Sequence, residues 1–332
     1  MKLTLKGTLK VTLPLLVGAL ILWFLYRNID VDRLLHTLRA DSKWWVIVVA
    51  SLFGTIGNTF RGLRWDIMLR QLDPPVKTLT NSILTTQGTY AVNMVLPRLG
   101  EIWRCGTMKL YTGLSFSKLF GTVVMDRALD ILVGVVLAIS AALLNYPFFY
   151  TFFRDNPDFI ERVETFSGST TFWILLAVFL VVLVVGIVLL RRFGFWEKFM
   201  HSLRDIWSGV QTVFTLNRRW SFLLYTVLIW VSYFLQFYLT FYAFSFMVGL
   251  GWEVALMAFV LITFSMVAPV QAGLGAWHFM VIYTLVFFGI GRDDAGSFAL
   301  IVHTFQTLWT TIVGLLCIAA LSVYNKKGSL NR

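Results

Sequence analysis

The charged residues best suited to chemistry stand inside apolar stretches of the sequence. Arg98, Glu101 and Arg104 are spaced three apart at the end of the run from Asn93 to Arg104. On a helix, this spacing lets Glu101 pair with either arginine. A paired guanidinium keeps unused N–H donors, so a polar cavity that contains these residues could bind a phosphate group. The alternative is an ion-pair lock at the edge of the apolar region.

A second charged group lies within a longer apolar stretch. Asp126 and Asp130 share one face of a predicted helix, and Arg127 projects about 100° away from Asp126. We expect the two carboxylates to pair with the run that ends at Arg104 or with the arginines at positions 61 and 64. Two alternatives stay open: this part of the helix extends into the cytoplasm, or Arg61 and Arg64 anchor on anionic lipid headgroups.

A third candidate segment carries backbone rather than charge. It contains Pro269, Gln271, Gly273, Gly275 and His278. Glycine allows close approach to the backbone, so exposed amides here could contact an anion. The single histidine is either neutral and hydrogen-bonded to a neighbouring helix, or part of the site.

The composition requires these residues to be positioned in a membrane. Of 332 residues, 58% are hydrophobic and 14% are charged, whereas about a quarter are charged in a soluble domain. This excludes a water-soluble fold. The net charge of +11 comes from short basic segments between apolar runs, which favours an anionic membrane surface over nucleic acid. Cys105 and Cys317 form no disulfide or metal-binding pattern.

The apolar stretches predict an all-α polytopic membrane protein with six full spans and two re-entrant helical hairpins. The predicted spans are 11–26, 44–60, 119–146, 172–190, 220–250 and 297–324. The predicted hairpins are 79–106, broken at Pro97 and Gly100, and 254–290, broken at Pro269, Gly273 and Gly275. Proline removes a helical donor, so each hairpin should have two short arms. The alternative is eight ordinary spans with kinks.

The distribution of Lys and Arg predicts the orientation. An integral protein of the cytoplasmic membrane, with both termini in the cytoplasm, places most of its 28 basic residues inside. The chain is then a single membrane domain, 1–332, with half-repeats at 1–146 and 172–325. The halves have opposite orientations and each contains a hairpin. Opposed broken segments of this kind point to a binding site near the midplane of a secondary transporter.

Four dispersed motifs resemble one membrane family. They are Arg61-x-x-Arg64-Trp65, the run from Asn93 to Arg104 with Pro97, Gly100 and Glu101, the Asp126-Arg127-x-x-Asp130 group, and Pro269 to Gly275. Together they resemble the lysylphosphatidylglycerol synthase transmembrane-region family, whose members are flippase-like. The resemblance implies movement of a lipid with a polar or charged headgroup between leaflets.

The sequence departs from that family in two respects. It ends at Arg332 without a soluble aminoacyl-transferase portion, so the resemblance does not extend to lipid modification. The second hairpin has Gln271, Ala272 and His278 where the family pattern is Pro-Gly-Gly-x-Gly followed by a glutamate. Substrate identity and proton coupling through that acidic position are therefore not implied.

The leading hypothesis is a lipid translocase that works by alternating access on a phospholipid or a polyprenyl-phosphate-linked lipid. We expect the arginines to meet the phosphate, and a separate lipid-modifying enzyme is a possible partner. The sequence has no P-loop, His-Glu-x-x-His or Gly-x-Ser-x-Gly motif, so no cofactor or metal is expected and an enzyme is less favoured than a transporter. Two alternatives remain: a membrane-embedded transferase that acts on a lipid-linked substrate, and a non-catalytic partner in envelope assembly.

Overall fold

The elements that the structure describes are helices. The computed structural model describes residues 31–72, 78–95, 99–144, 218–265 and 273–329, together with isolated positions elsewhere. In this part of the chain, β-pairing is limited to a bridge between Ser42 and Phe244. A short helix α2 (Val31–His36) and a π-helical turn η1 (Thr37–Asp41) precede the first long helix. The nearly all-helical fold agrees with the predicted class.

Four helices in the described ranges are long and apolar enough to cross a membrane. They are α3 (Trp44–Leu69), α6 (Phe116–Leu144), α11 (Arg219–Leu239) with the 3-10 turn η2 (Thr240–Ala243), and α14 (Arg292–Ser329). They correspond to the spans predicted at 44–60, 119–146, 220–250 and 297–324. The spans predicted at 11–26 and 172–190 lie almost entirely outside the described residues.

Three helix boundaries differ from the prediction. α3 continues to Leu69, so Arg61 and Arg64 lie within the helix and not after it. Because carboxylates of α6 meet both guanidinium groups, these charges do not end the buried part of α3. α11 ends before residue 250 and gives way to η2 and a second 3-10 turn, η3 (Ser245–Met247). α14 starts at Arg292, where two aspartates in its first turn favour the helix N-terminus.

Both segments interrupted by proline and glycine form two short helices. The first gives α4 (Leu79–Val95) and α5 (Gly100–Thr112), and the second gives α12 (Trp252–Ser265) and α13 (Ala276–Phe287). The backbone amide of Gly100 donates to Asn93 Oδ1 at 2.8 Å, which ties the start of α5 to α4. A Cβ atom at Gly88 would lie 2.7 Å from the Trp103 ring, so α5 runs back along α4. Pro97 and Pro269 lie outside the described residues.

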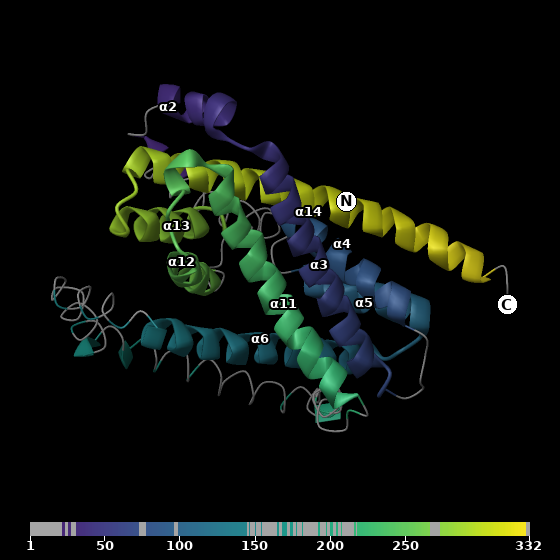
Figure 1. The fold of residues 1–332 in the computed structure, drawn as a ribbon. Coiled ribbons are helices and arrows are strands. Elements are labelled where there is room, and N and C mark those ends of the chain that lie inside the picture. Colours follow the sequence, from purple (N-terminus) through teal and green to yellow (C-terminus); the bar gives the residue numbers. More distant parts are fainter. Residues whose placement is uncertain are drawn as a thin grey trace.

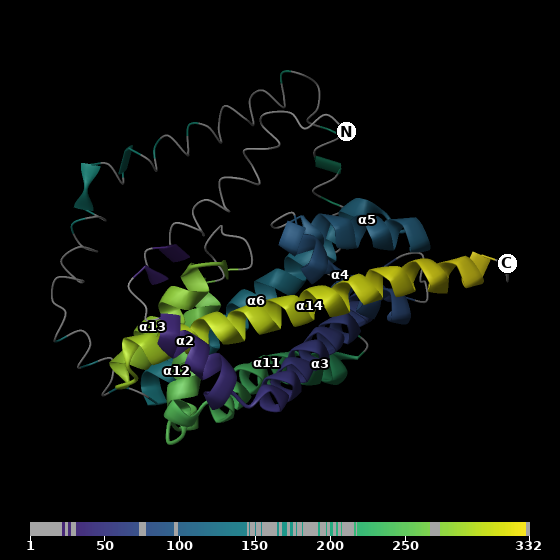
Figure 2. The same cartoon turned by 90° about the horizontal axis from the view of Figure 1, so that it is seen from above.

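Each pair of short helices packs against the same two long helices, α6 and α14. α4 packs along α14 and α3, and α5 packs on α6. In the second pair, α13 packs on α14 and α12 packs on α6 (Figure 1). Seen from above, α3 and α11 lie together on one side of α14 (Figure 2), and they pack closely against each other. Both pairs therefore lie between α6 and α14.

Two apolar clusters hold the helices together. One lies around α11, α13 and α14 and contains edge-to-face aromatic pairs, including Phe237 with Phe298 and Phe241 with Phe298. The other joins the end of α3 to α5 and the start of α6, with Trp65, Cys105 and Leu119 fully buried. This second cluster positions the charged residues of α3, α5 and α6.

Glycines bring α3 close to its neighbours. A Cβ atom at Gly57 would lie 2.8 Å from the ring of Tyr233 on α11. One at Gly62 would lie 2.7 Å from the Cα atom of Ile83 on α4. Helices in membranes use small residues to approach closely in this way. The missing side chains let α11 pack against the face of α3 that carries the arginines and let α4 pack against another face of the same helix.

Candidate functional site

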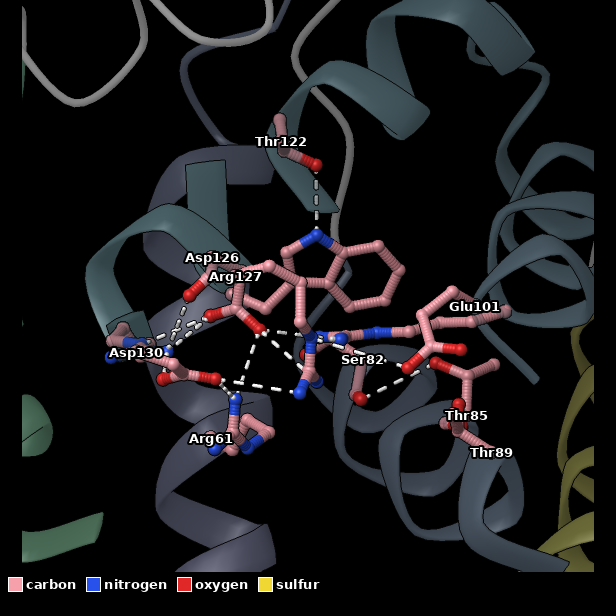
Figure 3. Close-up of polar contacts among 12 residues, drawn as sticks. Arg61, Ser82, Thr85, Thr89, Glu101, Thr122, Asp126, Arg127 and Asp130 are labelled. Atoms are coloured by element: carbon pink, nitrogen blue, oxygen red, sulfur yellow. Dashed lines mark hydrogen bonds and ion pairs between the residues drawn. The ribbon is translucent and has the colours of Figure 1, made fainter. Parts of the chain in front are cut away.

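Seven charged residues gather where α3, α5 and α6 meet. We call them the charged cluster, and their side chains point toward one another (Figure 3). They are Arg61 and Arg64 from α3, Glu101 and Arg104 from α5, and Asp126, Arg127 and Asp130 from α6. Residues far apart in the sequence thus form a single site.

The centre of the charged cluster is a pair of aspartates held by two arginines. Arg64 Nη2 lies 2.6 Å from Asp126 Oδ1 and 2.9 Å from Asp130 Oδ1. Arg61 Nη1 lies 2.5 Å from Asp130 Oδ2 and 3.3 Å from Asp126 Oδ2. Each arginine therefore bridges both aspartates, which confirms the expected pairing between residues 126 and 130 and the segment at 61–64.

These four side chains are removed from solvent. Arg64 and Asp126 have no exposed side-chain surface, Arg61 has 5% and Asp130 has 13%. A solvated helix extension does not fit a fully buried Asp126, and lipid-headgroup anchoring does not fit buried arginines. Opposite charges and hydrogen bonds offset the cost of removing the ions from water.

Arg104 is buried without comparable partners. Its guanidinium carbon lies 3.7 Å from the centre of the Trp65 ring, and its Nη1 lies 3.5 Å from Asp126 Oδ2. Within the described part of the chain, none of its three side-chain nitrogens has a hydrogen-bond partner. A guanidinium has five N–H donors. Arg104 thus has N–H donors for which the described protein groups provide no hydrogen-bond acceptor.

Glu101 pairs differently from the sequence prediction. Its Oε1 lies 4.0 Å from Arg127 Nε, whereas Arg104 turns toward Asp126 and Trp65. The stacking position beside Trp65 draws Arg104 away from its neighbour on the same helix. Arg127 also approaches Asp130 at 3.4 Å and keeps 41% of its side chain exposed. The other predicted partner, Arg98, lies outside the described residues.

Neighbouring helices fix the arginines through polar contacts that the sequence analysis missed. Arg61 Nε donates to the hydroxyl of Tyr233 on α11 at 3.3 Å, and that hydroxyl donates to Asn58 Oδ1 at 2.6 Å. Arg64 Nη1 donates to Thr226 Oγ1, also on α11, at 3.4 Å. The partners on α11 stand in an ordinary apolar span, so no sequence pattern marked them.

One face of α4 is polar and buried. Ser82, Thr85, Thr86 and Thr89 follow helical spacing, and all four are buried. Three of them lie on the side of the charged cluster that holds Glu101 (Figure 3). Thr86 Oγ1 has no hydrogen-bond partner among the described groups. This periodicity was visible in the sequence and could have indicated a polar lining.

The second hairpin places His278 in a different environment. Gly273 and Gly275 have φ values of 71° and 81°, a region that favours glycine, and the Gly275 amide donates to His278 Nδ1 at 3.4 Å. The imidazole is buried 4.5 Å from that of His303, measured between ring centroids. No contact in the described ranges joins it to the charged cluster. Gln271 lies outside them.

The charged cluster has a positive balance. Four arginines stand against three carboxylates, which leaves one positive charge among the described members. No group of three His, Cys, Asp or Glu side chains in the described ranges could hold a metal ion. A buried site with a surplus guanidinium is suited to bind an anion, and carboxylate and phosphate both match the geometry of arginine.

Comparison with known proteins identifies the family. The family model for the lysylphosphatidylglycerol synthase transmembrane region matches residues 11–314, and the chain belongs to this family. This confirms the resemblance drawn from the dispersed motifs and supports a membrane-lipid-related function. No curated protein and no solved structure matches the chain.

Proposed function

We propose that this member of the lysylphosphatidylglycerol synthase transmembrane-region family moves a phosphate-bearing lipid between the leaflets of the cytoplasmic membrane. The observation that carries the proposal is the positive balance of the buried charged cluster. If the cluster only held the helices together, equal numbers of positive and negative charges would be sufficient. A surplus buried cation costs at least about 2.5 kcal/mol on membrane-insertion scales, and a bound phosphate offsets that cost.

The short helices support a transport mechanism. α5 has 13 residues and α13 has 12, which at 1.5 Å per residue gives roughly 18–20 Å, against about 30 Å for the hydrocarbon core. Such arms suit re-entrant hairpins that end inside the membrane. Each hairpin lies between α6 and α14, as expected for two related halves. We include the inverted-topology repeat in the proposal.

Alternating access would follow from this arrangement. A headgroup bound beside the charged cluster becomes exposed to one leaflet or the other as the two halves rock about it, while the acyl chains stay in lipid. The two termini lie on the cytoplasmic side in this scheme, where the excess of Lys and Arg favours them.

A proteoliposome experiment tests the proposal. Fluorescent phosphatidylglycerol is placed in both leaflets, and its movement is followed by chemical quenching of the outer leaflet. We expect wild-type protein to exchange the lipid much faster than protein-free vesicles. The double variant Arg104→Gln, Arg127→Gln should lose at least about tenfold in rate, because it leaves two cations against three carboxylates.

The matched control removes the same charge from the same two helices away from the site. Lys109→Gln on α5 and Lys118→Gln on α6 should together leave the rate within about twofold. Mass spectrometry of the recovered lipid separates translocation from transfer chemistry, because translocation creates no new lipid species. No acceleration over empty vesicles, or equal rates for both double variants, would overturn the proposal.

A further inference from the structure

We infer that the charged cluster selects lipids whose headgroup carries net negative charge, with Arg104 contacting the phosphate and the hydroxyl face of α4 lining the space for the rest of the headgroup. The inference rests on the proposed function and specifies its substrate class. It depends on which charged groups of the site are already engaged and which are not.

The arginines of α3 are committed to the aspartates. Arg64 reaches Asp126 Oδ1 through both Nε and Nη2, at 3.0 and 2.6 Å, and Asp130 through Nη2. Arg61 uses Nη1 for both aspartates and Nε for Tyr233. These two side chains hold the site in place. The sequence analysis assigned Arg61, Arg64, Arg98 and Arg104 to the phosphate, and among those that the structure describes the geometry favours Arg104.

Arg104 meets the requirements of a phosphate ligand. It is fully buried, and in the described part of the chain its Nε, Nη1 and Nη2 lack hydrogen-bond partners. The Trp65 ring fixes the plane of the guanidinium from one face. Nη1 lies 3.5 Å from Asp126 Oδ2 and makes no hydrogen bond to a described group, so the guanidinium keeps N–H donors, and a phosphate accepts two parallel bonds from such a fork.

The two aspartates are already engaged by arginines and offer little to a cationic headgroup. All four oxygens of the two aspartates lie within hydrogen-bond distance of Arg61 or Arg64. Glu101 faces Arg127 at 4.0 Å. An ammonium group that entered the site would therefore meet a positive balance and no uncommitted buried carboxylate among the described members. A lysyl headgroup is disfavoured, and a zwitterionic one gains less than an anionic one.

The hydroxyl face of α4 adds a preference for hydroxyl-bearing headgroups. α14 packs against the opposite side of α4, where a Cβ atom at Gly314 would lie 2.7 Å from the Ala91 side chain. The face with Ser82, Thr85 and Thr89 lies toward the charged cluster. Thr86 Oγ1 on the same face is buried and unpartnered in the described structure. The hydroxyls of Ser82, Thr85 and Thr89 donate to backbone carbonyls of α4 and still have acceptor lone pairs, so a glycerol or sugar headgroup can donate hydrogen bonds to this row.

The test compares fluorescent lipids with identical acyl chains in proteoliposomes of neutral carrier lipid. The probes are phosphatidylglycerol, phosphatidic acid, phosphatidylcholine and lysylphosphatidylglycerol. We expect wild-type protein to move phosphatidylglycerol at least about tenfold faster than the zwitterionic and cationic probes, a factor equivalent to about 1.4 kcal/mol. Arg104→Gln should slow phosphatidylglycerol more strongly than phosphatidylcholine and so remove most of that preference. Arg104→Lys should restore part of it.

Two further measurements test which groups form the site. Thr86→Val should slow phosphatidylglycerol but not phosphatidic acid, whose headgroup has no glycerol hydroxyls, and Lys109→Gln should change neither. In native mass spectrometry, bound phosphatidylglycerol should persist in excess glycerol 3-phosphate and be lost from Arg104→Gln. Displacement by glycerol 3-phosphate would assign the site to a water-soluble phosphate and overturn the inference.

The outcomes separate the inference from the proposed function. Equal rates for all four probes, or fastest movement of lysylphosphatidylglycerol, would overturn the selectivity and leave a translocase. An unchanged charge preference in folded Arg104→Gln would overturn the role of that residue. Failure to move any probe would overturn the proposed function itself.

Discussion

The guanidinium of Arg104 stacks on the ring of Trp65, with 3.7 Å between the guanidinium carbon and the ring centre. Trp65 is itself fixed, because its Nε1 donates to Thr122 Oγ1 on α6 at 2.8 Å. A residue of α3 thus holds an arginine of α5 with the help of a hydroxyl of α6. This contact orients the one deeply buried guanidinium that lacks hydrogen-bond partners in the described structure.

Replacing Trp65 should therefore release Arg104. Trp65→Leu removes the aromatic face, and a desolvated cation–π contact contributes about 2 kcal/mol. We expect a lower thermal unfolding temperature in detergent and weaker retention of phosphatidylglycerol in native mass spectrometry. Trp65→Phe keeps a ring and should retain more of both, whereas Thr122→Val tests the indole hydrogen bond alone. Equal lipid retention by the Leu and Phe variants would contradict the stacking role.

Asp126 should be the most sensitive position for stability. It is fully buried and lies within 3.5 Å of Arg61, Arg64 and Arg104. Asp126→Asn leaves the surplus positive charge uncompensated, and breaking a buried pair on one side typically destabilises by about 3–5 kcal/mol. The free energy of unfolding in mixed micelles measures this loss.

The control for Asp126→Asn is a partly exposed ion pair at the end of α3. Arg70 Nε lies 2.7 Å from Asp66, and 42% of the Arg70 side chain is exposed. Asp66 is buried, but Thr78 Oγ1 still donates to its carboxylate and water can replace the exposed guanidinium, so Arg70→Gln should lose clearly less than Asp126→Asn, about 1 kcal/mol. Comparable losses for the two variants would mean that burial does not govern the energetics of the charged cluster.

Part of the site could be predicted because ions in apolar surroundings need partners. The four-residue spacing of Asp126 and Asp130 predicted one shared face. Because Arg127 projects away from that face, partners were expected on the first hairpin or at Arg61 and Arg64. The stacking of Arg104 could not be predicted, since it depends on how α5 packs against α3. No local pattern contains that tertiary contact.

The fold, too, could be predicted from the sequence only in part. Hydropathy located α3, α6, α11 and α14, whereas their ends depended on tertiary contacts. α3 extends past Arg61 because α6 supplies carboxylates, a contact absent from any local window of sequence. The helical spacing of Ser82, Thr85 and Thr89 could be seen in the sequence. Whether that face is buried depends on the packing of α4 between α3, α5 and α14.

Two glycine substitutions should have opposite effects. A Cβ atom at Gly62 would lie 2.7 Å from backbone Cα of Ile83, so Gly62→Ala must push α4 away from α3. Such overpacking typically costs about 1–3 kcal/mol. Gly106 in α5 has no heavy atom within 4 Å of the added Cβ, so Gly106→Ala should gain up to about 1 kcal/mol from helix propensity. Thermal unfolding of both variants checks the sign, and a stabilised Gly62→Ala would contradict the close packing of α3 on α4.

Labelling of single cysteines should distinguish a re-entrant hairpin from two full crossings. Leu99 lies at the turn before α5 and is partly exposed. In a background with Cys105 and Cys317 replaced by alanine, Leu99→Cys should resist a membrane-impermeant thiol reagent added from outside intact cells, because 13 residues of α5 span only about 20 Å. Tyr146→Cys, which the predicted orientation places at the outer surface, should label from outside, and Lys109→Cys should label only in inverted vesicles. Outside labelling of Leu99→Cys as fast as that of Tyr146→Cys would establish a full crossing, and the turn would then lie too far from the midplane to take part in alternating access.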